Sequence, residues 1–84
     1  MRYTVVWLPS AQNVLADIWN QASDRQAVAD AANGIDVALG ADAHQKGRPF
    51  RGQRRTLRIS PLGVVFTADP GDCMATVLKV RRVP

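Results

Sequence analysis

The pattern of apolar and polar positions predicts one strand, two helices and then three more strands. Residues 3–8 (YTVVWL) are rich in β-branched and aromatic side chains and are followed by Pro9, which is typical of a strand that ends there. Apolar side chains fall on both of its faces, so we expect an inner strand covered on both sides. Trp7 belongs to this strand, and we expect its ring to pack in the core.

A first helix is predicted for residues 11–21, with Ser10 as its N-cap. Apolar residues recur in this stretch at helical spacing. The expected buried stripe consists of Val14, Leu15, Ile18, Trp19 and Ala22. We therefore expect the second tryptophan, like the first, to lie in the core.

A second helix is predicted to begin after Ser23, which fits a capping box with Gln26, and to end with Gly40 as the C′ residue. Glycine inside a helix costs about 1 kcal/mol relative to alanine. We therefore expect Gly34 either to kink this helix or to allow close packing on the first one. The connection between the helices is short, so they form an antiparallel hairpin. The expected apolar stripe of the second helix is Val28, Ala32, Ile35 and Leu39.

The second half of the chain contains a predicted β-hairpin with one apolar and one basic face. Two apolar runs, residues 56–59 and 62–66, are separated by Ser60-Pro61, where proline cannot donate to a strand ladder. Alternation places Leu57 and Ile59 on one face. The opposite face then carries Arg54, Thr56 and Arg58.

The hairpin is flanked by a long loop and a last strand. Residues 41–53 have no periodicity and contain two glycines and a proline, which predicts a loop of a length that is usually functional or disordered. A turn at Asp69-Pro70-Gly71-Asp72 leads to the last strand, residues 74–82. Alternation there predicts two faces, Thr76, Leu78 and Val80 against Val77, Lys79 and Arg81.

These elements predict an α+β fold in the order β-α-α-β-β-β, within a single domain over residues 1–84. The helical hairpin would pack on one face of a small antiparallel sheet. The other face of the sheet would remain partly open and basic.

Charge is divided unevenly along the chain, whose net charge is +4. Residues 1–40 carry two arginines and four aspartates, whereas residues 41–84 carry nine Lys or Arg and three aspartates. Arginine outnumbers lysine nine to two, which favours planar, bidentate contacts with phosphate or carboxylate. The asymmetry indicates an anionic partner, either nucleic acid or an acidic protein segment. A basic face that is merely solvated is the alternative.

The composition also narrows the class of protein. The single cysteine, Cys73, allows no intrachain disulfide, and we expect neither a signal peptide nor a membrane span. The expected location is therefore the cytoplasm. The sequence contains no Cys/His metal cluster, no phosphate-binding glycine loop and no Ser-His-Asp set. We accordingly expect no cofactor and no metal.

Four stretches occur together in a recognisable order: YTVVWLPSAQNVLADIW, AANGIDVALGAD, RRTLRISPLGVVFTAD and ATVLKVRR. In this order they resemble the RelE/ParE superfamily of bacterial type II toxin–antitoxin toxins, also known as plasmid stabilisation proteins. The similarity lies in a strand followed by Pro-x-Ala and a Leu-x-x-Ile helix, in an Arg-Leu…Pro-Leu hairpin, and in a last strand that runs into arginines. It covers nearly the whole chain.

The resemblance implies the family's fold and a cognate antitoxin as partner, a small protein whose extended or helical segment wraps the toxin. It also implies one of two targets. One branch of the superfamily cleaves mRNA in the ribosomal A site, and another poisons DNA gyrase. A toxin of either kind arrests growth.

Metal-independent cleavage of RNA needs a base for the 2′-hydroxyl, cations for the phosphate charge and an acid for the leaving oxygen. The candidate catalytic residues are Arg54, Arg58 and Arg81, with His44, the only histidine, as a further candidate. The candidates for binding nucleic acid or another target are Lys46, Arg48, Arg51, Arg55, Lys79 and Arg82. Arg55 has a structural alternative, because it points inward with Leu57 and can pair with an Asp or cap a helix end.

Several functions remain open at this point. Ribosome-dependent members of the family commonly carry a Tyr or His near the carboxyl end, and KVRRVP contains neither. This departure favours gyrase as the target, whereas the arginine cluster favours contact with RNA. The alternative function is a catalytically inactive toxin-like binding module, either an antitoxin sink or a small RNA-binding protein. A fragment whose core is completed by self-association is a further alternative.

Overall fold

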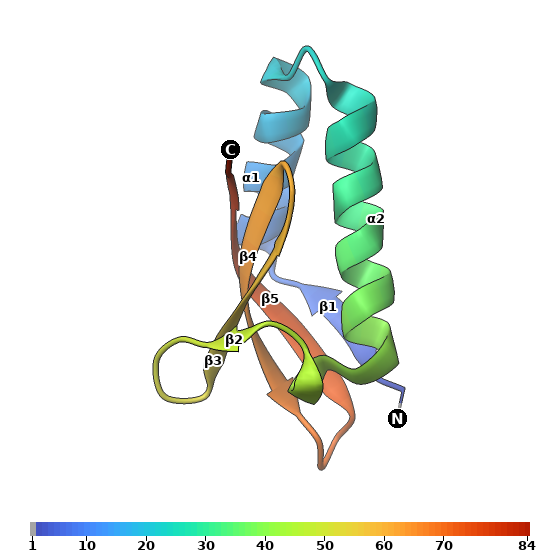
Figure 1. Cartoon of the computed structure of the whole chain (residues 1–84), viewed down its shortest axis with the longest axis vertical. Coiled ribbons are helices and arrows are strands. Elements are labelled where there is room, and N and C mark those ends of the chain that lie inside the picture. Colours follow the sequence, from blue (N-terminus) through green and yellow to red (C-terminus); the bar gives the residue numbers. More distant parts are fainter. Residues whose placement is uncertain (1) are drawn as a thin grey trace.

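The computed structural model, which describes residues 2–84, shows two helices packed on one face of a five-stranded sheet (Figure 1). The predicted α+β class and the order of the elements are confirmed. One short strand is additional, because part of the expected loop pairs with the hairpin. The elements are β1 (Thr4–Trp7), α1 (Pro9–Gln21), α2 (Arg25–Asp42), the 3₁₀ helix η1 (Ala43–Gln45), β2 (Arg48–Pro49), β3 (Arg54–Ile59), β4 (Leu62–Asp69) and β5 (Met74–Arg82).

The strands are arranged in the order β1-β5-β4-β3-β2, so β1 is an edge strand, and the prediction of an inner strand covered on both sides was wrong. Three neighbouring pairs are antiparallel, but β1 runs parallel to β5, so that Thr4 pairs with Met74 and Trp7 with Val77. The sheet is therefore mixed, whereas a wholly antiparallel sheet was predicted. Side chains alternate in the same way in parallel and antiparallel pairs, and alternation for this reason carries no information on strand direction.

The core lies between the sheet and the helices. The second helix contributes the predicted stripe, with Ala32 half-buried and the other three members fully buried. The predicted hairpin is also confirmed, since Ile59 pairs with Leu62 across Ser60-Pro61. The largest fully buried side chains are Phe66, Ile35, Leu39, Leu62, Val28 and Val77.

The first helix begins two residues before the predicted start. Pro9 is its first residue and Leu8, rather than Ser10, is the N-cap. Proline suits the first turn of a helix because the N–H that it lacks would have no partner there. The preference of serine for the N-cap position was outweighed by this effect.

The second helix also differs from the prediction at both ends. Its N-cap is Asp24 and no capping box forms with Ser23. At the other end Gly40 lies inside the helix, and its carbonyl accepts a hydrogen bond from the backbone N–H of Tyr3 at 2.9 Å. Gly34 leaves the helix continuous, and a Cβ there would lie 3.4 Å from Cδ1 of Ile59. The close approach that this glycine allows is thus to β3 and not to α1.

The two tryptophans differ in their surroundings. Trp7 is half-buried, and its indole N–H donates to a carboxylate oxygen of Asp36 at 2.6 Å. Trp19 is 42% exposed, with the guanidinium of Arg25 4.8 Å from its ring centroid, so the prediction of a core position was wrong for this residue. At helical spacing Trp19 lies at one margin of the stripe that packs on the core and Val14 lies at the other. Val14 is exposed for the same reason, whereas Ala11, Leu15, Ile18 and Ala22 pack on the core.

A β-bulge in β5 changes which side chains face the helices. Val65 pairs with Lys79 and Phe66 pairs with Val77, so Leu78 has no direct partner. Val77 and Val80 are both buried although they are three residues apart. The prediction that Val77 shares a face with Lys79 was therefore wrong, because strict alternation cannot accommodate the extra residue of a bulge.

Candidate functional site

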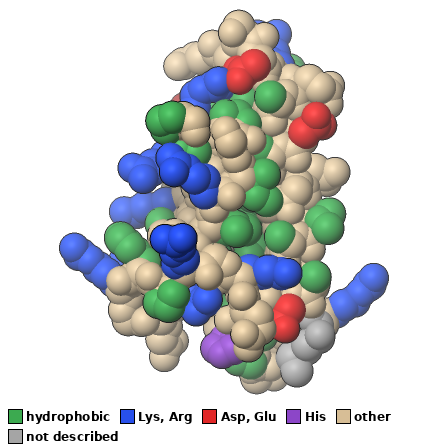
Figure 2. Space-filling model, in the orientation of Figure 1, with side chains coloured by type: hydrophobic (Ala, Val, Ile, Leu, Met, Phe, Trp, Pro, Cys, Tyr) green, Lys and Arg blue, Asp and Glu red, His purple; other side chains and the backbone are tan. Residues whose placement is uncertain are grey.

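The face of the sheet that is turned away from the helices, called the open face below, carries most of the predicted cations in cross-strand rows. Residues that pair directly across neighbouring strands point to the same face. One row consists of Arg58, Gly63 and Arg81. The next consists of Arg48, Thr56, Val65 and Lys79. Figure 2 shows Lys and Arg side chains gathered on the strand side of the molecule.

A shallow depression with a volume of about 670 Å³ lies on the open face. Gly63 lies between Arg58 and Arg81, which are two strands apart and therefore separated by roughly 10 Å at their backbones. Long, flexible cationic side chains at this separation can both reach an anion bound between them. The exposed side chains that line the depression are Phe50, Arg58, Lys79 and Arg81, and the less exposed ones include Thr56, Val65 and Val83.

No acidic side chain balances these charges. Within residues 2–84 the one ion pair joins Arg82 to Asp24, so Arg58, Lys79 and Arg81 have no carboxylate partner. A cluster of cations over a partly apolar floor is a suitable site for an anion such as a phosphate, because no carboxylate among residues 2–84 pairs with Arg58, Lys79 or Arg81.

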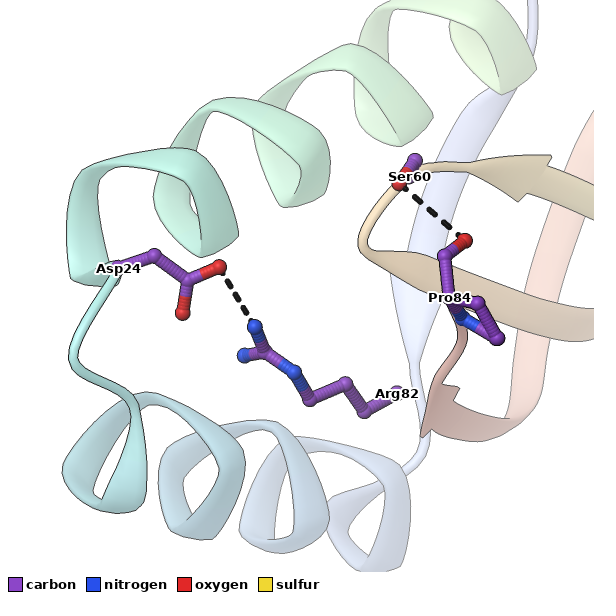
Figure 3. Close-up of polar contacts among 4 residues, drawn as sticks. All are labelled: Asp24, Ser60, Arg82 and Pro84. Carbon is purple, nitrogen blue, oxygen red and sulfur yellow. Dashed lines mark hydrogen bonds and ion pairs between the residues drawn. The ribbon is translucent and has the colours of Figure 1, made fainter.

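Arg82 lies on the opposite side of the sheet from Arg81. It pairs across the ladder with the buried residue Leu62, and its guanidinium donates to a carboxylate oxygen of Asp24 at 2.5 Å (Figure 3). This hydrogen bond lowers the pKa of the Asp24 carboxyl below its ordinary value. Arg82 therefore joins the end of β5 to the connection between the helices, outside the depression.

The end of the chain is also joined to the β3–β4 turn. The Ser60 hydroxyl donates to the carbonyl oxygen of Pro84 at 3.5 Å (Figure 3), and the backbone N–H of Val83 donates to that of Pro61 at 2.8 Å. Val83 is thereby held against Gly63, where an added Cβ would lie 3.0 Å from its Cγ1.

Arg55 also points away from the open face, toward the helices. It pairs with the buried residue Phe66, and its guanidinium donates to the backbone carbonyls of Lys46 at 2.8 Å and Gly47 at 3.2 Å. Its contacts are thus structural: no Asp is involved, but Lys46 is the C-cap residue of η1, so Arg55 binds a helix end, which was one of the two predicted structural roles. These contacts position the segment that leads into β2 and so place Arg48 beside the hairpin.

The remaining predicted cations do not line the depression. Arg54 is on the open face, in a row with Thr67 and beside the edge of the sheet. The guanidinium of Arg51 lies 5.7 Å from the ring centroid of Phe50. Lys46 and His44 precede β2 and are not among the side chains that line the depression.

The architecture matches those of solved bacterial toxins. The RelBE2 toxin–antitoxin complex from Mycobacterium tuberculosis contains a chain with a TM-score of 0.79 and 16% identity, over 98% of this chain and 92% of that one. A chain of the chromosomal ParDE toxin–antitoxin system from P. aeruginosa matches with a TM-score of 0.72 and 22% identity, over 99% and 98%. The chain has the RelE/ParE toxin fold.

A third match is a free E. coli RelE toxin in which two arginines are replaced by alanine. Its TM-score is 0.65 at 15% identity, over 98% of this chain and 84% of that one. The RelE/ParE fold predicted from the four sequence stretches is therefore confirmed over nearly the whole chain. No family model matches the sequence, and no curated protein matches it either.

The side chains that line the depression are suited to binding an anion and not to accepting a proton. Arginine and lysine side chains can bind a phosphate and stabilise added negative charge on it. Within residues 2–84, no Asp, His or Tyr side chain lines the depression, so the usual groups that accept a proton from a hydroxyl are missing from its lining. The same residues contain no group of three or more His, Cys or Asp side chains that could hold a metal ion. No helix among them is long and apolar enough to cross a membrane.

Sequence reasoning missed two residues of the depression. Phe50 was assigned to the long loop with no role, although an aromatic ring between Arg48 and Arg51 is itself a signal of nucleic-acid contact. Gly63 was not singled out because its position between two arginines depends on the register of three strands. No local pattern reports that register.

Proposed function

We propose that this chain is the toxin of a type II toxin–antitoxin module, that it binds its target at the depression on the open face, and that a cognate antitoxin neutralises it. The observation that carries the proposal is the convergence of Arg58, Lys79 and Arg81 around Gly63. The RelE/ParE fold supports it, and the RelBE2 structure of that fold is a toxin–antitoxin complex.

The target is either mRNA on the ribosome or DNA gyrase, and both would place the protein in the cytoplasm. A phosphate bound between Arg58 and Arg81 would have its charge stabilised from two sides, as RNA cleavage requires. Because no Asp, His or Tyr side chain of residues 2–84 lines the depression, cleavage would use a general base supplied by the ribosome, while Arg58, Lys79 and Arg81 stabilise the negative charge on the phosphate. Gyrase poisoning would need only the binding function.

The antitoxin is expected to supply negative charge to the depression. An acidic segment laid across β3, β4 and β5 would pair with Arg58, Lys79 and Arg81 and would compete directly with the target. A small acidic protein encoded beside this chain, and purifying with it, is the expected partner.

A second candidate function is a catalytically inactive module that binds RNA or sequesters an antitoxin. The specific observation that favours it is the absence of Asp, His and Tyr from the depression lining within residues 2–84. Such a module would bind RNA with a steep dependence on salt and would neither cleave it nor arrest growth.

The experiment that tests the proposal combines growth and cell-free translation. Induced expression of the chain should arrest bacterial growth, and co-expression of the antitoxin should restore it. Arg81→Ala should abolish the arrest, while Arg2→Ala, which removes the same charge outside the depression, should preserve it. Purified protein added to cell-free translation, followed by primer extension on a defined mRNA, then identifies the target.

The outcomes separate the candidates. Cuts in the mRNA that appear only while ribosomes translate indicate a ribonuclease, whereas growth arrest with intact mRNA and normal translation indicates gyrase. Harmless expression at high level, with salt-dependent RNA binding, would support the inactive module. If Arg81→Ala and Arg2→Ala were equally toxic, the depression would have no role in toxicity.

A further inference from the structure

Phe50 is an exposed aromatic residue at the margin of the basic depression. Its side chain is 55% exposed, and it lines the depression together with Thr56, Val65 and Lys79. Water contact with so much of an apolar ring is unfavourable by itself. A ring that remains accessible beside clustered cations offers a flat apolar surface to whatever binds there.

The backbone that carries the ring is positioned by the hydrogen bonds of a tight turn. The N–H of Phe50 donates to the carbonyl of Arg54 at 2.9 Å, and the N–H of Arg54 donates to the carbonyl of Arg51 at 2.8 Å. Gly52, with a φ of +54°, supplies the left-handed backbone conformation that this turn needs. Phe50 therefore extends the β2–β3 ladder and does not sit on an unpaired loop.

The surroundings of the ring are cationic on two sides. The guanidinium of Arg51 lies 5.7 Å from its centroid, within the range of a cation–π contact. Across the depression, Arg58, Lys79 and Arg81 supply the positive charge. An aromatic ring beside a line of cations is the combination by which proteins bind single-stranded nucleic acid, with bases stacked on the ring and phosphates on the charges.

We propose that Phe50 is a stacking platform for an unpaired base of a single-stranded nucleic acid whose phosphates lie among Arg58, Lys79 and Arg81. The proposal rests on the proposed function and names the ligand class of the same site. A base pair hides both faces of its bases within the duplex, whereas an unpaired base can lie flat on the ring. The site thus selects single strands.

The test compares strands that carry bases with a strand that does not. Binding of a labelled eight-nucleotide uridine strand, its deoxyuridine equivalent and an abasic strand with the same number of phosphates is measured by fluorescence anisotropy. Phe50→Ala should weaken binding of the base-bearing strands about 5- to 100-fold, the range of one lost stacking contact, and leave abasic binding unchanged. Phe50→Trp should preserve the preference for bases. RNA and DNA strands are both included because stacking alone does not distinguish them.

Two control variants complete the design. Val37→Ala removes an apolar side chain that is 68% exposed on α2. This variant should change neither the affinity for base-bearing strands nor the affinity for the abasic strand. Arg81→Ala should weaken the binding of base-bearing and abasic strands alike, and it should lower the slope of log affinity against log salt concentration by about one.

Each remaining outcome has a separate meaning. Wild-type affinity of Phe50→Ala for the uridine strand would overturn the stacking role and leave the anion site intact. An equal loss on both kinds of strand would mean that Phe50 only supports the turn. Toxicity without binding of any strand would indicate a protein target and overturn the inference alone, whereas absence of both would remove the proposed function as well.

Discussion

Gly63 determines how much space lies between the two arginines that flank it. Val83 packs over this position, and a Cβ there would lie 3.0 Å from Cγ1 of Val83, closer than is usual for such contacts. The glycine is therefore required for the shape of the depression. Its backbone is in an ordinary strand of the sheet, so the requirement is for space and not for an unusual φ.

We predict that affinity for a single-stranded oligonucleotide falls with the size of the side chain at position 63, from Gly63→Ala to Gly63→Val. The added methyl groups would push Val83 outward, into the space where a phosphate would meet Arg58 and Arg81. We expect a loss of a few-fold for alanine and of about tenfold or more for valine, a little over 1 kcal/mol, measured by anisotropy.

Gly40→Ala is the matched control, because its Cβ would meet only ordinary contacts at 3.8 Å or more. Far-ultraviolet circular dichroism should show that all three variants are folded. Unchanged affinity of a folded Gly63→Val protein would show that the anion binds elsewhere on the sheet.

The strand β4 connects the core of the protein with its open face. It lies between β3 and β5, and its side chains alternate, with Leu62, Val64 and Phe66 buried and Val65 on the open face. A change on the helix side of this strand should thus alter stability first, and a change on the open side should alter binding first.

We predict that Phe66→Ala lowers the free energy of unfolding by about 3–5 kcal/mol, because the ring is fully buried and its removal leaves a cavity. Leu57→Ala on the neighbouring strand should cost less, about 1–2 kcal/mol, since this side chain is only half-buried. Urea denaturation followed by circular dichroism measures both. A cost for Leu57→Ala equal to that for Phe66→Ala would contradict the assignment of the core to the centre of the sheet.

The bulge in β5 lets one strand contribute both to the apolar core and to the cationic open face. Before Leu78 the buried side chains are Ala75 and Val77, and after it Val80 is buried while Lys79 and Arg81 are on the open face. A regular strand with Val77 in the core would direct Lys79 and Arg81 toward the helices. The extra residue therefore combines an apolar core contact with a cationic open face.

In the whole molecule, the end of the chain is tied to the helical hairpin by one ion pair. Arg82 donates to Asp24, at the connection between α1 and α2, and this contact joins residues 58 positions apart in the sequence. Both side chains are partly exposed, so the pair is screened by solvent. Its detectable effect should be a dependence of stability on pH.

We predict that wild-type protein loses stability relative to Asp24→Asn as the solution becomes acidic. The hydrogen bond from Arg82 lowers the pKa of the Asp24 carboxyl in the folded state below the ordinary value of 3.8. The contribution of this carboxylate to stability is therefore fully present above pH 3.8 and is lost as the pH falls through the lower, folded-state pKa. The difference in Tm between the two proteins should be largest near neutral pH and narrow below pH 3.8.

Thermal melts from pH 7 to pH 2 provide the measurement, with Asp17→Asn as a control for removing an exposed aspartate of α1. Arg82→Ala should reproduce the loss of pH dependence seen in Asp24→Asn, and the double variant should add little to either single one. A Tm difference that stays constant from pH 7 to pH 2 would mean that the ion pair does not stabilise the folded protein.

The sequence by itself determined the two helices and the four longer strands, and the faces of α2 and of the hairpin. The α2 stripe, the hairpin at Ser60-Pro61 and the placement of Arg58 opposite Leu57 follow from side-chain periodicity, which neighbouring residues encode. The four ordered stretches also predicted the RelE/ParE fold. Only the tertiary structure decided that β1 lies parallel to β5, that a bulge at Leu78 shifts the face of β5, and that Trp19 remains exposed.

The candidate site was likewise predicted in part from the sequence and decided in part by the tertiary structure. Periodicity identified the basic face and placed Arg81 and Arg82 on opposite faces of the last strand, but it could not show that Arg81 lines a depression or that Arg82 binds Asp24. It also could not place Phe50 or Gly63 between the cations. The physical reason is that these positions depend on register and packing between segments far apart in the chain. Such contacts are selected by the burial of the whole core and not by local preference.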